Sequence, residues 1–376
     1  MFTVTKWLLM ATGCWTLPVE PYLQIPYKIY QIFIWVGYFC ATLGFSANFF
    51  VYIGVDNDRA VEALSYSIVG ILLTIKLLLL MTPSITGLVK TVTEDKFVGA
   101  KESLKMRRMV LSYKRFVGRV DIFFVVSSYS MVSLFTIKEA LVEYLAYCKS
   151  HPNATEEPEY LLTIWVPVDM QKHFLLALHL QMYLVFQTGA QNYAALSMYI
   201  TLMVYTALKL KILRHSLRNF SKHCTSEADV LRALNQLARE HQNIINFVQV
   251  LHKSFKPGLL IEYTASSLIL ASTIVQIIRG DKMCIFILSA SLYTFQLFLL
   301  SWNSEKIRNQ SLMMGTSLYK SDWYFYGAKV MRFILFMMLR SSKPLTLNIG
   351  PFGPNTMETA MARARLGYSY VTVMSS

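Results

Sequence analysis

Charged residues are scarce in this sequence. Asp, Glu, Lys and Arg make up 15% of the 376 residues, whereas hydrophobic residues make up 54%. Soluble domains carry roughly 25% charged residues, so the composition disfavours the two soluble domains that this length would allow. Long stretches without charge are instead typical of membrane spans, each of which needs about 20 apolar residues to cross the hydrocarbon layer.

Cysteine is also rare, and the motifs of catalytic and metal sites are missing. None of the five cysteines forms a CxxC pair, which disfavours a zinc site or a redox motif. The sequence has no HExxH, GxSxG or P-loop motif, and His173, His179 and His241 are too scattered for a metal site. We therefore predict no enzymatic activity, no metal and no cofactor. Cys148 and Cys284 are expected near the outer face, where two free thiols are favoured over a disulfide.

Seven long apolar stretches predict an all-α, polytopic membrane protein with one transmembrane domain over residues 1–376. The approximate limits of the stretches are 30–53, 61–89, 119–146, 173–208, 257–279, 283–302 and 325–347. A cluster of Pro and Gly between residues 344 and 354 follows the last stretch and is expected to break the helix. We therefore interpret segment 355–376, which is weakly apolar, as the second half of a broken seventh helix.

The net charge of +14 comes from basic residues concentrated in alternate loops. The loops at 90–118, 209–256 and 303–324 are rich in Lys and Arg, whereas those at 54–60, 147–172 and 280–282 are poor in them. Cytoplasmic loops of membrane proteins carry an excess of Lys and Arg. The N-terminus is therefore predicted in the cytoplasm and the C-terminus outside, and the basic charge needs no nucleic-acid partner. Asn153, in an Asn-Ala-Thr triplet, is a glycosylation candidate on the outer side.

This orientation is opposite to that of G-protein-coupled receptors, and the sequence lacks their DRY and NPxxY motifs. A metabotropic seven-helix receptor is therefore disfavoured but stays an alternative. A secondary transporter is disfavoured because only one helix break is evident, where that class tends to have one in each half. Within the predicted cytoplasmic segment 1–29, the apolar run from Trp7 to Leu17 is interpreted as a cytoplasmic or interfacial segment rather than a cleaved signal.

The fourth loop, 209–256, has the pattern of an amphipathic helix. Its apolar residues recur at spacings of three, four and seven, which is one face of a helix with 3.6 residues per turn. They are Leu231, Leu234, Leu237, Ile244, Ile245, Val248 and Leu251. The fourth and fifth membrane helices are therefore predicted to project below the membrane and to pack on each other. A helix lying on the membrane surface is the less favoured alternative, because the basic residues are not confined to one flank.

Two segments resemble those of insect odorant receptors. The stretch Arg239–Leu260 is similar to the segment before that family's fifth helix, and Ser317–Met374 is similar to its C-terminal signature. The family-like points of the signature include the run from Arg340 to Pro344 and the Tyr-Ser-Tyr triplet at 368–370. Residues 11–18 resemble the family's Gly/Trp/Pro start. The absence of a QF pair after Tyr370 disfavours the related gustatory receptors, which remain an alternative.

The resemblance implies an odorant-gated, poorly selective cation channel in the plasma membrane of olfactory neuron dendrites. Four subunits, including a common co-receptor, would surround one pore. Residues 303–354 would form a cytoplasmic anchor with the first half of helix seven, and 355–376 would line the pore. Val373 matches the family's hydrophobic gate by its offset from Tyr370, and Ser369 and Ser376 lie on the same stripe. Packing against a neighbouring helix is the alternative role for Val373.

The resemblance also places a small volatile or semi-volatile ligand in the outer half of helices two, three, four and six. The side chains expected there are mostly apolar with a few polar groups, as is usual for small-molecule sites. For each of them, ordinary helix packing is an equal alternative. The candidates are Tyr66, Val69, Leu73, Met131, Leu134, Ile137, Leu176, Leu180, Tyr183, Phe286, Ser289, Ala290 and Tyr293.

Some charged residues are expected at membrane depth within the predicted spans. Lys76 lies in the middle of the second, Glu139 in the outer part of the third and Glu262 near the start of the fifth. A charge at membrane depth is costly and usually faces protein or water. For Lys76, an ion pair with a carboxylate, a place in a vestibule and extension to the membrane surface all remain open.

Overall fold

The computed structural model describes residues 3–55, 57–95, 104–149, 174–222, 224, 226–279, 283–362 and 365. Within these residues the chain is helical and has no named β-strand, as the sequence predicts. The α-helices are α1 (Thr3–Ala11), α2 (Gln24–Tyr52), α3 (Asn57–Leu80), α4 (Pro83–Glu94), α5 (Leu104–Lys149), α6 (Phe174–Arg218), α7 (Glu227–Arg279), α8 (Met283–Tyr319) and α9 (Ala328–Ser341). Two short 3₁₀ turns, η1 (Pro21–Leu23) and η2 (Trp323–Phe325), precede α2 and α9.

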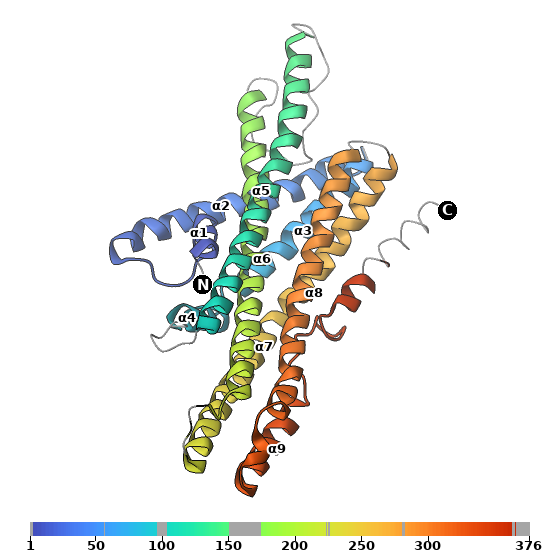
Figure 1. Cartoon of the computed structure of the whole chain (residues 1–376). Helices are drawn as coiled ribbons and strands as arrows, with labels where there is room; N and C mark the ends of the chain where they lie inside the picture. Colours follow the sequence, from blue (N-terminus) through green and yellow to red (C-terminus); the bar gives the residue numbers. More distant parts are fainter. Residues whose placement is uncertain are drawn as a thin grey trace.

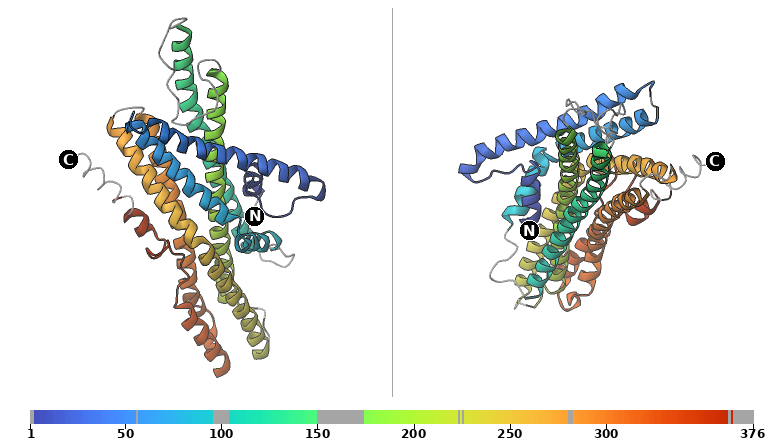
Figure 2. Two further views of the ribbon diagram at one scale, coloured as in Figure 1. Left: turned by 180° about the vertical axis from the view of Figure 1, so that it is seen from behind. Right: turned by 90° about the horizontal axis from the view of Figure 1, so that it is seen from above.

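Four long helices, α5 to α8, run lengthwise through the molecule, and α2 and α3 cross them obliquely (Figures 1 and 2). Helix α6 is central and packs against α5, α7 and α8. Residues 194–208 of α6 are all buried, because neighbours cover the helix on every side. This stretch of α6 forms the middle of the hydrophobic core.

Helix α2 instead exposes a large apolar surface. Its exposed side chains include Ile25, Ile29, Ile32, Phe33, Val36 and Leu43. An apolar surface of this kind fits lipid better than water. By length and hydropathy alone, two described helical segments could cross a membrane, Pro21–Tyr52 and Met182–Arg218, and the bent pair α3–α4 would make a third.

The second predicted span, 61–89, is not one straight helix. Helix α3 ends at Leu80, α4 begins at Pro83, and the axes of Tyr66–Leu80 and Pro83–Glu94 differ by 56°. Thr82 is extended, with φ −63° and ψ 147°, as expected for the residue before a proline. The apolar composition continues through this break, so composition alone gave a single span.

The helix packing predicted for 209–256 is confirmed, whereas its cytoplasmic location stays a prediction. Helix α7 runs unbroken from Glu227 to Arg279, through Pro257, and packs against α6. The predicted apolar face lies against the core, with Leu231 and Leu237 partly buried and the other five residues buried. Aromatic contacts join the two helices, with 4.4 Å between the ring centroids of Tyr199 and Phe255. Gly258 allows this approach, because a Cβ there would lie 1.9 Å from the Tyr199 hydroxyl.

The seventh apolar stretch, 325–347, forms a shorter helix than predicted. Helix α9 has 14 residues, packs on α8 and lies at the far end of the molecule from the C-terminal end of α5 and the N-terminal end of α6 (Figure 1). At 1.5 Å per residue it is about 21 Å long, too short for a hydrocarbon layer of about 30 Å. The predicted break follows it: Gly350 and Gly353 take positive φ angles, and helix resumes at Met357.

The N-terminal segment packs against the helical bundle, and its predicted cytoplasmic or interfacial location stays a prediction. Trp7 is 70% exposed, but Leu9, Cys14 and Trp15 are buried in the main core. Thr5 donates a hydrogen bond of 2.6 Å to the carboxylate of Asp121 on α5. The segment therefore folds back onto α5 and α6 as part of the bundle.

Candidate functional site

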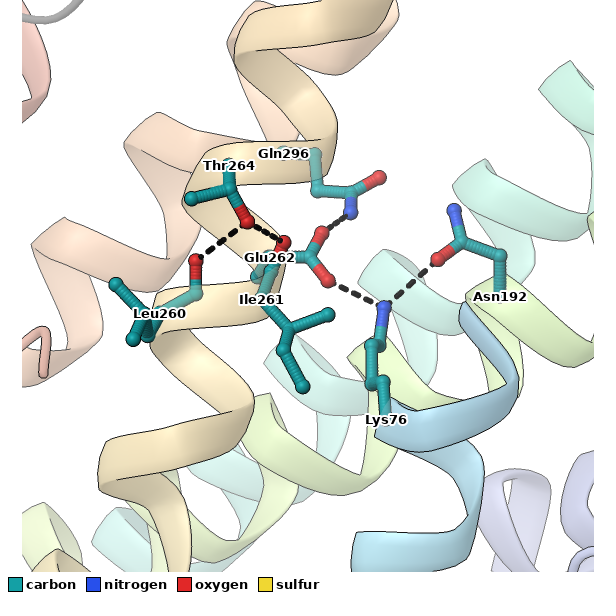
Figure 3. A network of polar contacts seen from close by, with 7 residues as sticks. All are labelled: Lys76, Asn192, Leu260, Ile261, Glu262, Thr264 and Gln296. Carbon is teal, nitrogen blue, oxygen red and sulfur yellow. Dashed lines mark hydrogen bonds and ion pairs between the residues drawn. The ribbon is translucent and has the colours of Figure 1, made fainter. Parts of the chain in front are cut away.

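A buried ion pair joins α3 to α7 in the middle of the bundle. The ammonium of Lys76 contacts the carboxylate of Glu262, and it also donates a 2.7 Å hydrogen bond to the amide oxygen of Asn192 on α6. The amide nitrogen of Gln296 on α8 donates to the other carboxylate oxygen. Figure 3 shows these four side chains pointing toward one another from four helices.

The charges in this network are almost completely removed from solvent. The side chains of Lys76 and Glu262 are 2% and 4% exposed. Removing an ion from water costs several kcal/mol, which is offset only when a partner charge and further hydrogen bonds are in place. Asn192 and Gln296 supply those hydrogen bonds, so each member of the network needs the others. Of the three possibilities left open for Lys76, the structure shows the ion pair.

The sequence brings these polar groups together through helical faces. Lys76 lies on the buried face of α3, with the buried residues Leu73 and Leu80 three and four positions away. Glu262 shares its face of α7 with Leu259 and Ser266, which are also buried. Since residues three and four apart share one face of a helix, each polar side chain must enter the core with its apolar neighbours.

One of the predicted ligand residues, Tyr293, lies next to this network. Tyr293 on α8 is close enough to Tyr66, Tyr193 and Glu262 to interact with them electrostatically. Its helix also carries Ser289, which is buried, and Ala290, which is half-buried. The ring of Tyr66 lies 5.5 Å from the ring of Phe45 on α2.

Val69 on α3 is half-buried and Leu73 is buried. Lys76 follows them along α3, and Gln296 follows Tyr293 along α8. The α3 and α8 candidates therefore come within electrostatic range of each other at Tyr66 and Tyr293.

The predicted residues of α6 are placed differently. Leu176 is 60% exposed, and Leu180 packs in a small cluster with Ala41 and Phe45 of α2. Tyr183 is 38% exposed and lies beside Gly37 of α2. Leu180 and Tyr183 thus lie against α2 and Leu176 is exposed, and their assignment to the ligand site stays a prediction. The side chains of Met131, Leu134, Ile137 and Phe286 lie outside the described part of the structure.

A second buried polar cluster lies where segment 355–376 begins. The hydroxyl of Tyr263 donates a 2.8 Å hydrogen bond to the side-chain oxygen of Asn355, as does the hydroxyl of Ser301 at 2.8 Å. The backbone N–H of Met357 donates to Glu305 at 3.3 Å. The first turn of this segment is thus attached to α7 and α8. The pore candidates Ser369, Val373 and Ser376, and the glycosylation candidate Asn153, lie outside the described residues.

Sequence reasoning missed several members of both clusters. Asn192, Gln296, Tyr263 and Asn355 were not singled out, although a signal existed: a side-chain amide inside an apolar span needs a hydrogen-bond partner. Asp121 was also missed. It accepts hydrogen bonds from Thr5 and from Ser197 of α6 and lies at the start of the third predicted span.

Comparison with known proteins now decides the family. A family model described as 7tm Odorant receptor matches residues 56–368. The chain belongs to the insect odorant receptor family. Among curated members, it is 21% identical over 206 residues to Odorant receptor Or2 of Anopheles gambiae, which covers 52% of this chain and 54% of that one. It is 24% identical over 179 residues to Odorant receptor 22a of Drosophila melanogaster, covering 46% and 44%. The matches thus span about half the length of these relatives.

The solved structure of the olfactory receptor OR5 of Machilis hrabei in complex with eugenol has the same fold. It superposes with a TM-score of 0.83 over 98% of this chain and 96% of that one, at 13% identity. A second solved structure of that receptor gives a TM-score of 0.82. This agreement confirms the predicted all-α, seven-helix membrane architecture. The orientation of the termini stays a prediction from the loop charges.

Proposed function

We propose that this chain is the odorant-binding subunit of a heteromeric, odorant-gated, non-selective cation channel. Its partner is the odorant co-receptor of the family, and the complex lies in the plasma membrane of an olfactory neuron dendrite. The N-terminus is cytoplasmic and the C-terminus lies outside. Membership of the odorant receptor family supports this proposal. The observation that carries the mechanism is the position of α7, which contacts both the ligand-side helices and the first turn of segment 355–376.

In this mechanism, a small volatile binds where α3 and α8 converge, beside Tyr66, Val69, Ser289, Ala290 and Tyr293. Its presence changes the packing of α3 against α7 at the Lys76–Glu262 pair. Helix α7 passes the change to Asn355 through Tyr263, one residue further along. Segment 355–376 then moves and widens a hydrophobic constriction at Val373, where ion flow is blocked by dewetting in the closed state.

Binding energy limits how strongly the closed state can be favoured. A volatile that buries roughly 200 Å² of apolar surface gains about 5 kcal/mol. Shifting an equilibrium from 1:99 to 99:1 requires about 5.5 kcal/mol of differential affinity between the two states. Even if all the burial occurred in the open state only, a small odorant could barely drive this shift. The closed state is therefore expected to be favoured by only a few kcal/mol.

The test is whole-cell current in cells that express this chain with and without the co-receptor, during an odorant panel and with G-protein signalling blocked. A fast, non-selective cation current that needs both subunits is expected. Surface expression of both subunits without current, together with a second-messenger response that the block abolishes, would favour the metabotropic alternative. A C-terminal epitope tag should be accessible on intact cells, whereas a hidden tag would contradict the orientation.

A further inference from the structure

Three basic side chains from two helices gather between α5, α6 and α8. Lys211 and Arg214 lie one turn apart on α6, and Lys306 lies on α8. The ammonium of Lys306 is 3.2 Å from the centroid of the Trp302 ring and 5.0 Å from the centroid of the Phe116 ring. Lys211 lies over the ring of Tyr113 on α5, at 5.4 Å.

The guanidinium of Arg214 donates a 3.0 Å hydrogen bond to the amide oxygen of Gln310, one turn beyond Lys306 on α8. All three basic residues are half-buried. We call Lys211, Arg214 and Lys306 the basic cluster.

No carboxylate among the described residues pairs with the basic cluster. The nearby basic residues differ in this respect: Lys209 pairs with Asp95, and Lys90 lies 3.9 Å from Glu94. Lys211 and Lys306 are close enough for like-charge repulsion, which acts together with burial. Burial first, and the charge of Lys211 second, lower the pKa of Lys306 to about 8. Holding cations together without a counter-charge is unfavourable unless an anion joins them.

The position of the basic cluster along the chain indicates its depth. Lys211 follows the predicted fourth span, which ends at 208, and Lys306 follows the sixth, which ends at 302. Tyr113 and Phe116 precede the third span, which starts at 119. Three helices thus reach the predicted cytoplasmic membrane surface at one place. Trp302, which is exposed, fits this depth, since Trp and Tyr are enriched at the headgroup level.

We propose that the basic cluster binds the phosphorylated headgroup of a phosphoinositide in the cytoplasmic leaflet. A phosphomonoester carries up to two negative charges and several acceptor oxygens, so it can receive hydrogen bonds from two ammonium groups and a guanidinium together. A headgroup with a single charge, such as that of phosphatidylserine, satisfies this cluster less well. Polybasic sites beside membrane spans recognise phosphoinositides on the same principle. The proposal depends on the predicted orientation but not on the chain's conducting ions.

The experiment is a lipid titration of the full-length chain, delipidated in detergent and followed by native mass spectrometry. The probes are phosphatidylinositol 4,5-bisphosphate, phosphatidylserine and phosphatidylcholine. The bisphosphate is expected to bind more tightly than either other lipid. In the double variant Lys211→Gln/Lys306→Gln, its affinity should fall by roughly tenfold or more, because two charge-assisted contacts are lost. Equal binding of all three lipids by the unmodified chain would overturn the proposal.

The matched control is Lys253→Gln/Lys320→Gln, which removes the same charge from two exposed lysines away from the basic cluster. Its affinity for the bisphosphate lipid should equal that of the unmodified chain. An equal loss of affinity in both variants would mean that only the overall positive charge of the chain attracts the lipid. Lys306→Arg keeps the charge and should retain binding, which separates loss of the site from misfolding. Soluble inositol trisphosphate tests whether the ligand is a lipid or a free phosphate. If it competed for the basic cluster as strongly as the lipid itself, the ligand would be a free phosphate and the lipid assignment would be overturned.

Discussion

Glu262 and Tyr263 are consecutive residues of α7 that belong to two different polar clusters. The carboxylate of Glu262 contacts Lys76 and Gln296, whereas the hydroxyl of Tyr263 donates to Asn355 at the start of segment 355–376. Successive side chains on a helix point about 100° apart, so a rotation or tilt of α7 alters both clusters at once. This relationship makes α7 the expected connection between the ligand-side helices and the pore segment.

The first prediction concerns the buried ion pair. Lys76→Met leaves the carboxylate of Glu262 buried without its partner charge, and should lower the free energy of unfolding by about 3–5 kcal/mol. The double variant Lys76→Met/Glu262→Met removes both charges and should recover most of that loss. Thermal unfolding of the purified chain, followed by size-exclusion chromatography, measures both effects.

Lys253→Met is the control for this pair, because Lys253 is an exposed lysine on the same helix as Glu262. It should unfold at the same temperature as the unmodified chain. If Lys76→Met unfolded no earlier than this control, the ion pair would contribute nothing to stability.

The second prediction concerns the connection to the pore segment. Tyr263→Phe removes one hydroxyl and leaves the 2.8 Å hydrogen bond from Ser301 to Asn355 in place. The loss should cost about 1 kcal/mol of coupling, and a factor of about five in odorant EC50 corresponds to that energy. Surface expression should stay unchanged. Tyr324→Phe, at an exposed tyrosine, is the control for the concentration–response measurement. Equal EC50 values for the two variants would exclude Tyr263 from the coupling.

The features predicted correctly from sequence are those that local periodicity determines. The apolar face from Leu231 to Leu251 repeats every three or four residues, so its burial could be expected from the sequence alone. The partner of Lys76 could not, because Glu262 is 186 positions away and Glu139, also expected at membrane depth, was equally plausible. The contact of Tyr183 with α2 could not be predicted for a related reason: the helical period shows that a residue lies on some face of a helix, but not which neighbouring helix that face meets.

The third prediction concerns the ligand residues. Tyr293→Ala removes a ring beside Tyr66, Tyr193 and Glu262, and should change the rank order of active odorants. Individual EC50 values should shift by about tenfold or more, as expected when 1–3 kcal/mol of contact is lost from a binding pocket. Tyr183→Ala removes the same kind of side chain from the surface beside α2 and should leave the order unchanged. The reverse result, with the order altered by Tyr183→Ala only, would move the ligand site toward α2.

The fourth prediction concerns pH and the buried histidine His241. Burial, and then the charge of Arg340, lower the pKa of His241 on α7 to about 4. The ordinary value for histidine is about 6.5, so between these two values the unfolded chain binds a proton that the folded chain does not. The stability that His241 contributes is thus fully present above pH 6.5 and is lost as the pH falls toward 4. His252, whose pKa is lowered first by burial and then by Lys256, adds a smaller effect of the same sign.

Thermal unfolding of the purified chain at pH 7.5 and at pH 5 measures this dependence. The melting temperature should fall at pH 5, and His241→Gln should reduce the fall because its side chain takes up no proton in this range. The part of the fall in melting temperature that remains in His241→Gln is assigned to His252. The double variant His241→Gln/His252→Gln should therefore be the least sensitive to pH. If the melting temperature fell by the same amount at pH 5 in the unmodified chain, the single variant and the double variant, neither histidine would control the acid stability of the chain.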